Sequence, residues 1–163
     1  MKEVAILLLV ALMLNGCGST VASVPTASGG IWSSDMFGGE GLASGLSFVT
    51  QFTVGTNGAI TVSTFQLLTQ TAGGCFPVTG PRPTGTLLAN FNSADQVVPP
   101  FSFNFTVTSS GNTLTLTGTS MTGTLNTTNN TLSNGVITGT WTLTGGTSCN
   151  TNGTFTMTQS TSG

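Results

Sequence analysis

Ionisable side chains are the first candidates for chemistry, and this chain has very few of them. Lysine, arginine, aspartate and glutamate make up 4% of the 163 residues, and histidine and tyrosine are absent. A typical soluble domain has about 25% charged residues. The complete set is Lys2, Glu3, Asp35, Glu40, Arg82 and Asp95. Acid–base chemistry would have to come from the carboxyl groups of Asp35, Glu40 and Asp95.

Each kind of catalytic or metal site lacks a partner that its chemistry requires. A glycoside hydrolase would need two of the acidic residues within about 5 to 10 Å of each other in a cleft. Asp35 and Glu40 lie in a glycine-rich loop after the first predicted strand, where we expect both to be solvated. Ca²⁺ usually needs more carboxylates than this loop offers, and the many hydroxyl groups have no histidine to activate them. The sequence therefore predicts no catalytic residue, no metal site and no cofactor.

The low charge also limits the partners. With two cationic residues and a net charge of -2, the chain lacks the clustered lysine and arginine that neutralise phosphates, which excludes a nucleic-acid binder of that kind. Hydrophobic residues make up 37% and there are 23 glycines, which together are normal for a folded domain. We therefore expect a folded, non-enzymatic protein.

The N-terminus has the pattern of an export signal. An unbroken apolar run extends from Val4 to Leu14, which is too short to span a bilayer as a helix but matches the central region of a secretory signal. Leu14, Gly16 and Cys17 resemble the lipobox of bacterial lipoproteins. The resemblance implies that residues 1–16 are a signal peptide and that Cys17 becomes the lipidated N-terminus. Gly18, which is not acidic, implies export to the outer membrane, and an ordinary cleaved signal is the alternative.

Two further cysteines remain if Cys17 carries lipid. Cys75 and Cys149 would then be an even pair in an oxidising compartment, which predicts a structural disulfide. Closing a loop of this size stabilises a fold by about 4 to 5 kcal/mol in the chain-entropy model. A reactive thiol or metal site is the alternative, and it would need a cation, a histidine or more cysteines nearby.

The rest of the chain predicts an all-β domain. Residues 17–29 read as a flexible tether and residues 30–163 as a single domain. From Phe101 to Thr108, large apolar residues alternate with polar ones, which is typical of a half-buried strand. We expect strands near 30–34, 45–54, 59–69, 84–91, 101–109, 112–119, 121–127, 135–145 and 152–160. We read 72–83 and 95–100 as loops or broken edges because they contain proline.

Short strands separated by tight turns predict an antiparallel meander. Turn residues such as Asn57–Gly58, Asn129–Asn130 and Asn134–Gly135 separate the strands. Eight to ten such strands form either a closed or nearly closed up-and-down barrel or a two-sheet sandwich, and sequential hairpins favour the barrel. Gly30-Ile31-Trp32 is similar to the Gly-x-Trp of the first strand in calycins, the group that includes lipocalins. This resemblance implies a barrel with a small apolar ligand at one mouth.

Two functional hypotheses follow. In the first, a lipid-anchored barrel binds a small apolar ligand or another envelope component through aromatic residues. The alternative role of these residues is to fill the core. The candidate lining residues are Phe48, Phe52, Phe65, Phe103, Phe105 and Trp141. In the second, alternating threonines within 113–119, 138–144 and 154–158 form an adhesive or self-associating surface, with ice or polysaccharide as a minor alternative. Membrane attachment through the lipid is common to both.

Overall fold

The computed structural model describes residues 30–43, 45–69, 74–76 and 81–160. The predicted signal peptide, the tether and Cys17 lie outside these residues. The described chain forms one 3₁₀ turn, Gly41–Ala43, and eight strands. The strands are β1 (Ile31–Gly38), β2 (Ser47–Val54), β3 (Ala59–Thr69), β4 (Arg82–Phe91), β5 (Val97–Ser109), β6 (Asn112–Asn126), β7 (Thr131–Thr144) and β8 (Thr151–Ser160).

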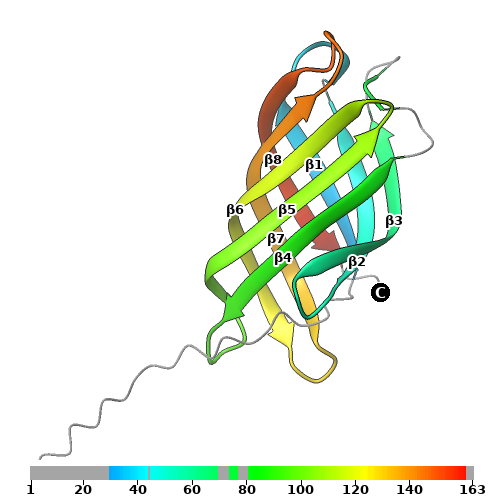
Figure 1. The fold of residues 1–163 in the computed structure, drawn as a ribbon. Helices are drawn as coiled ribbons and strands as arrows, with labels where there is room; N and C mark the ends of the chain where they lie inside the picture. Colours follow the sequence, from blue (N-terminus) through cyan, green and yellow to red (C-terminus); the bar gives the residue numbers. More distant parts are fainter. Residues whose placement is uncertain (1–29, 44, 70–73, 77–80, 161–163) are drawn as a thin grey trace, which may run out of the picture.

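The strands form a closed barrel in chain order (Figure 1). Every neighbour is antiparallel, and β1 closes the barrel against β8 from Ile31 opposite Ser160 to Gly38 opposite Gly153. The predicted all-β meander is confirmed, and the barrel rather than the two-sheet sandwich is the architecture. Within the described residues, no helix is long and apolar enough to cross a membrane.

Alternating side chains explain why the strands close around a core. In β7, Ile137, Trp141 and Leu143 are buried, while Thr140 and Thr142 between them are exposed. Successive residues of a strand point to opposite faces, so the barrel has an apolar interior and an exterior rich in hydroxyl groups.

Several predicted boundaries were wrong, for one shared reason. Residues 112–119 and 121–127 belong to one strand, β6, because irregular pairing near Thr119 and Gly123 bends the strand without ending it. Asn134–Gly135 is likewise part of β7 and not a turn. A β-bulge adds a residue and a local kink to a continuing ladder, and its asparagine and glycine resemble turn residues.

Two segments that we read as loops are also strand. Asp35 lies within β1, which continues to Gly38. Residues 97–100 lie within β5, where Val97 and Val98 pair with Phe91 and Asn90 of β4. A register shift between Leu88 and Asn90 accommodates the cis peptide bond between Pro99 and Pro100. Proline occurs in strands at such irregular positions.

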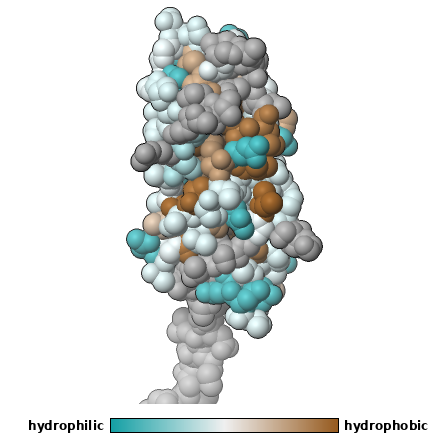
Figure 2. Space-filling model, turned by 90° about the vertical axis from the view of Figure 1, so that its right-hand side faces the viewer, coloured by the Kyte–Doolittle hydropathy of each residue, from teal (hydrophilic) through white to brown (hydrophobic). Residues whose placement is uncertain are grey.

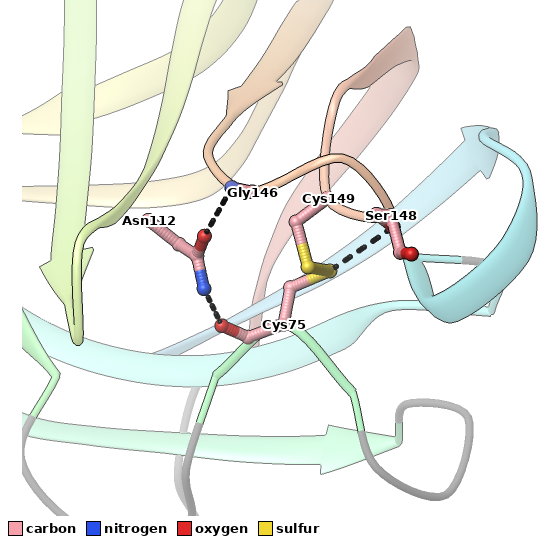
Figure 3. Close-up of a disulfide and its surroundings, with 5 residues drawn as sticks. All are labelled: Cys75, Asn112, Gly146, Ser148 and Cys149. Atoms are coloured by element: carbon pink, nitrogen blue, oxygen red, sulfur yellow. Dashed lines mark hydrogen bonds between the residues drawn. A yellow bond between two sulfur atoms is a disulfide. The ribbon is translucent and has the colours of Figure 1, made fainter.

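The predicted disulfide is present and fastens one end of the barrel. Cys75 and Cys149 are bonded, with 5.6 Å between their Cα atoms and a sequence separation of 74. The side-chain amide of Asn112 donates to the Cys75 carbonyl, and its oxygen accepts from the Gly146 N–H at 3.3 Å (Figure 3). The segment after β3 is thus tied to the start of β6 and to the β7–β8 loop. We call this the disulfide end.

Candidate functional site: a seam in the barrel wall

One boundary between neighbouring strands is much less completely paired than the others. In the described residues, β3 pairs with β4 only where Ala59 lies opposite Thr86 and Ile60 opposite Gly85. By contrast, β4 pairs with β5 along almost its whole length, from Arg82 opposite Thr108 to Phe91 opposite Val97. We call the boundary between β4 and the part of β3 beyond Ile60 the seam.

The seam has a physical cause on each side. Continuing the β3–β4 register would place Val62 opposite Pro83, and proline lacks the N–H that a ladder needs. On β3, the register against β2 shifts at Ser63 and again at Leu68. Such bulges bend a strand, so β3 diverges from β4 as it runs toward the disulfide end. We read 72–83 as a loop or broken edge; its last two residues, Arg82 and Pro83, belong to β4, and residues 72, 73 and 77–80 lie outside the described part of the chain.

Apolar side chains are only partly covered along the seam. Val62, Phe65 and Leu67 of β3 pack against the core but are half-buried, while Leu68 is 53% exposed. Leu88 of β4 is 45% exposed as well, but it lies beside Gly58 of the β2–β3 turn, outside the seam. The side of the barrel on the right in Figure 1, where β2 and β3 are labelled, faces the viewer in Figure 2 and has hydrophobic residues across its middle. The seam is thus a part of the barrel wall where apolar side chains that pack against the core are partly exposed to solvent.

The structure brings the predicted phenylalanines together in one cluster. Phe105 lies at the centre, with its ring centroid 5.8 Å from that of Phe48 and 6.4 Å from that of Phe65, and the Phe48 and Phe65 centroids are 5.0 Å apart. Phe105 also contacts Phe52 at 6.4 Å and Phe103 at 6.2 Å. Four of the five are almost completely buried, and Phe65 alone is half-buried. Phe65 therefore connects the buried rings to the seam.

Trp141 has a different environment from the phenylalanines. It is buried, and its indole N–H donates to the Phe37 carbonyl of β1 at 3.1 Å. A side chain at Gly39 would come within 2.9 Å of its ring, so the β1–β2 loop lies directly over it. Trp141 therefore packs beneath this loop, toward the disulfide end, rather than at the seam.

Two buried hydroxyl groups were not singled out from the sequence. Ser34 is 1% exposed and Thr50 is 0% exposed. Thr50 donates from Oγ1 to the Thr64 carbonyl at 2.9 Å, whereas Oγ of Ser34 has no hydrogen-bond partner. The spacing of Trp32, Ser34 and Met36 already places Ser34 on the inner face, so alternation could have identified its position. Its lack of a partner could not be read from sequence.

The acidic residues are not gathered into one site. Asp35 lies in β1, Glu40 in the loop after it, and Asp95 in the connection between β4 and β5. Glu40 borders a surface hollow of about 380 Å³ with Thr147, Ser148, Asn150 and Thr151. A second hollow of about 350 Å³, beside Gln96 and Asn134, has no acidic lining residue. In the described part of the chain, no three histidine, cysteine or acidic residues are grouped as metal ligands.

The predicted threonine arrays lie in register across the barrel. Thr115 of β6 pairs with Thr106 of β5 and Thr142 of β7, and Thr117 pairs with Thr140 in the next outward row. Thr140 in turn pairs with Thr154 of β8. We call the outward face of β5 to β8 the threonine wall. Its hydroxyl groups follow a regular two-dimensional pattern on a curved surface.

No protein-family model, no curated protein and no solved structure matches this chain.

Proposed function

We propose that this protein is a non-enzymatic, lipid-anchored component of the bacterial cell envelope that binds a small apolar ligand. The lipobox-like residues that end at Cys17 support the anchor and a location at the outer membrane. The shortage of ionisable groups supports a role without catalysis. The barrel with its disulfide is the rigid scaffold for binding.

The partly exposed side chains of Val62, Phe65 and Leu67 on β3 are the observation that supports binding most directly. Ligand pockets are mostly apolar concavities with a few polar groups. On β5, Phe103 and Phe105 are buried, while Phe101 is half-buried. At the seam, Val62, Phe65 and Leu67 remain accessible beside the same aromatic cluster. The site we propose is therefore at the seam and not at a mouth of the barrel.

Titration with naphthalene tests binding. We expect one saturable site in the barrel domain, followed by the fluorescence of naphthalene. Val62→Lys should weaken binding because it places a charge among the seam's apolar side chains, while its long stem lets the ammonium group reach water. Gln66→Lys is the matched control, since it adds the same charge at an exposed position of β3. Equal affinity in these two variants, or no saturation in the wild-type protein, would contradict the proposal.

Mass spectrometry of the mature protein tests the anchor separately. We expect an N-terminus at Cys17 carrying lipid, and a Cys17→Ser variant that is no longer held in the membrane fraction. A mature chain that begins elsewhere without lipid would remove the anchor but leave the ligand proposal intact.

The threonine wall supports a second candidate function, an adhesive or self-associating surface. Its in-register rows on β5 to β8 present hydroxyl groups and no lysine to discourage association. Replacing Thr115, Thr117, Thr140 and Thr142 with lysine should abolish adhesion to polysaccharide or to other copies, while naphthalene binding persists. Unchanged adhesion in this variant would exclude the wall as the contact surface.

A further inference from the structure

Both ends of the barrel are closed by packed side chains. At the disulfide end, Phe76, Leu46 and Ala43 are each no more than 2% exposed. At the opposite end, the Gln159 side chain donates to the Leu132 carbonyl at 2.8 Å and accepts from the Gly135 N–H at 3.1 Å. Trp32, beside Gln159 in the β1–β8 ladder, is 2% exposed. Among the described residues, apolar side chains that pack against the core are partly exposed along the seam, at Val62, Phe65 and Leu67, and on β5, at Val97 and Phe101. The three on β3 are the ones beside the buried phenylalanine cluster.

An unsatisfied polar group lies in the interior close to the seam. Ser34 lies opposite Phe48 of β2 and Met157 of β8, so its neighbours in the ladder on both sides offer no polar side-chain atom. A buried hydroxyl without a partner costs free energy, and nearly all such groups in folded proteins are hydrogen-bonded. The Ser34 hydroxyl would therefore be stabilised by a hydrogen bond to a bound molecule, since no group in the described part of the protein forms one with it.

A short row of side chains links this hydroxyl to the seam. Ser34 pairs with Phe48, and Phe48 pairs with Leu67 of β3. The three residues thus lie side by side across three adjacent strands, and adjacent strands are about 4.8 Å apart. The Phe48 ring also contacts Phe65, which is half-buried. In this row only Phe48 separates Ser34 from Leu67, and because Phe48 is fully buried, a ligand that enters beside Phe65 and Leu67 reaches Ser34 by displacing this ring.

The geometry points to a ligand with a flat or flexible apolar body and one uncharged hydrogen-bonding group, held with its body in the seam and its polar group on the Ser34 hydroxyl. This inference rests on the proposed binding function and adds the polar anchor, the route of access and the ligand class. A serine hydroxyl both donates and accepts, so an alcohol or a carbonyl compound fits equally. The apolar neighbours Phe48 and Met157 disfavour a charged group, because burying an unpaired charge is costly.

A matched pair of ligands tests this anchor. Naphthalene and 2-naphthol have the same apolar body, and only 2-naphthol carries a hydroxyl. We expect the wild-type protein to bind 2-naphthol about 3 to 10 times more tightly than naphthalene, the ratio that one net hydrogen bond provides. Ser34→Ala should bring this ratio close to one and leave the affinity for naphthalene unchanged.

Ser33→Ala is the control, because Ser33 is the adjacent serine of β1 and alternation places it on the outer face. This variant should keep the wild-type ratio. Equal binding of the two ligands by the wild-type protein, or an unchanged ratio in Ser34→Ala, would overturn the polar anchor while naphthalene binding at the seam still stood. Absence of saturable binding for both ligands would overturn the proposed function and this inference together.

The route of access is tested by association rates. Stopped-flow mixing with 2-naphthol should show slower association in Val62→Lys than in Gln66→Lys. Only Val62→Lys places a longer, charged side chain among the apolar residues of the seam, where the ligand enters. Identical association rates in these two variants would place the path elsewhere.

Discussion

The threonine wall and the seam are built from similar residues yet differ in how they are held together. β6 and β7 in the wall pair from Thr113 opposite Thr144 to Asn126 opposite Thr131, through two irregularities. In the described residues, β3 and β4 pair at two positions, Ala59 and Ile60, and not along the seam beyond them. Both regions have alternating apolar and polar residues, so alternation alone does not decide whether two strands pair. Proline and bulges decide it at the seam.

The two regions also differ in what their inner faces contact. Behind the wall, Leu114, Leu116 and Ile137 are fully buried. At the seam, Val62, Phe65 and Leu67 have core on one side and solvent on the other. A region with few ladder bonds and partly exposed side chains opens at a lower free energy than the rest of a domain. The wall is therefore the rigid part of the barrel and the seam the part suited to admit a ligand.

Removing the disulfide should have the largest effect and should separate the two regions most clearly. The double variant Cys75→Ser, Cys149→Ser should lose about 4 kcal/mol of unfolding free energy, because the bond closes a loop of 74 residues. Denaturant titration measures this loss. In the described residues β3 and β4 pair at only two positions, so hydrogen exchange should accelerate most at β3 and β4. An equal acceleration in β6 and β7 would show that the disulfide does not hold the seam specifically.

The next largest effect is the loss of unfolding free energy when a phenylalanine of the cluster is replaced with alanine, and it should differ between two of them. Phe105→Ala should cost about 3 to 5 kcal/mol, since the ring is fully buried and its removal leaves a cavity. Phe65→Ala should cost clearly less in the same denaturant titration, because its half-buried ring already contacts solvent at the seam. The same loss for both variants would mean that the seam is closed in solution.

Much of this comparison could be predicted from the sequence, but its decisive part could not. The alternation of apolar and polar residues predicted the all-β meander, and the even number of cysteines left after Cys17 predicted the Cys75–Cys149 bond. The prolines near Pro83 predicted a loop or a broken strand edge. The prediction of a turn at Asn134–Gly135 was wrong, because β-bulges and turns favour the same residue types. The seam also depends on shifts at Ser63 and Leu68, which follow from packing between strands and leave no local pattern. Lipidation of Cys17 remains a prediction.

A glycine substitution tests the rigidity of the wall. Gly139 of β7 pairs with Gly118 of β6, and a side chain there would lie 2.8 Å from the Phe155 ring and 2.9 Å from the Gly118 Cα. Gly139→Ala should cost about 1 to 3 kcal/mol through overpacking, measured as a lower denaturation midpoint. Gly146→Ala is the control, because nothing lies within 4 Å of the added carbon. Tolerance of Gly139→Ala would mean that the wall can shift as readily as the seam.

The smallest expected effect separates the two buried hydroxyls. Thr50→Val removes an oxygen that donates to the Thr64 carbonyl, and should cost about 1 kcal/mol in the free protein because that bond is lost. Ser34→Ala removes a hydroxyl that has no partner, so it should leave the stability of the free protein unchanged or slightly raised. Denaturant titrations of both variants without ligand measure the difference. A loss of stability in Ser34→Ala as large as in Thr50→Val would mean that Ser34 already has a partner in the free protein, and the hydroxyl would then not be available to anchor a ligand from the seam.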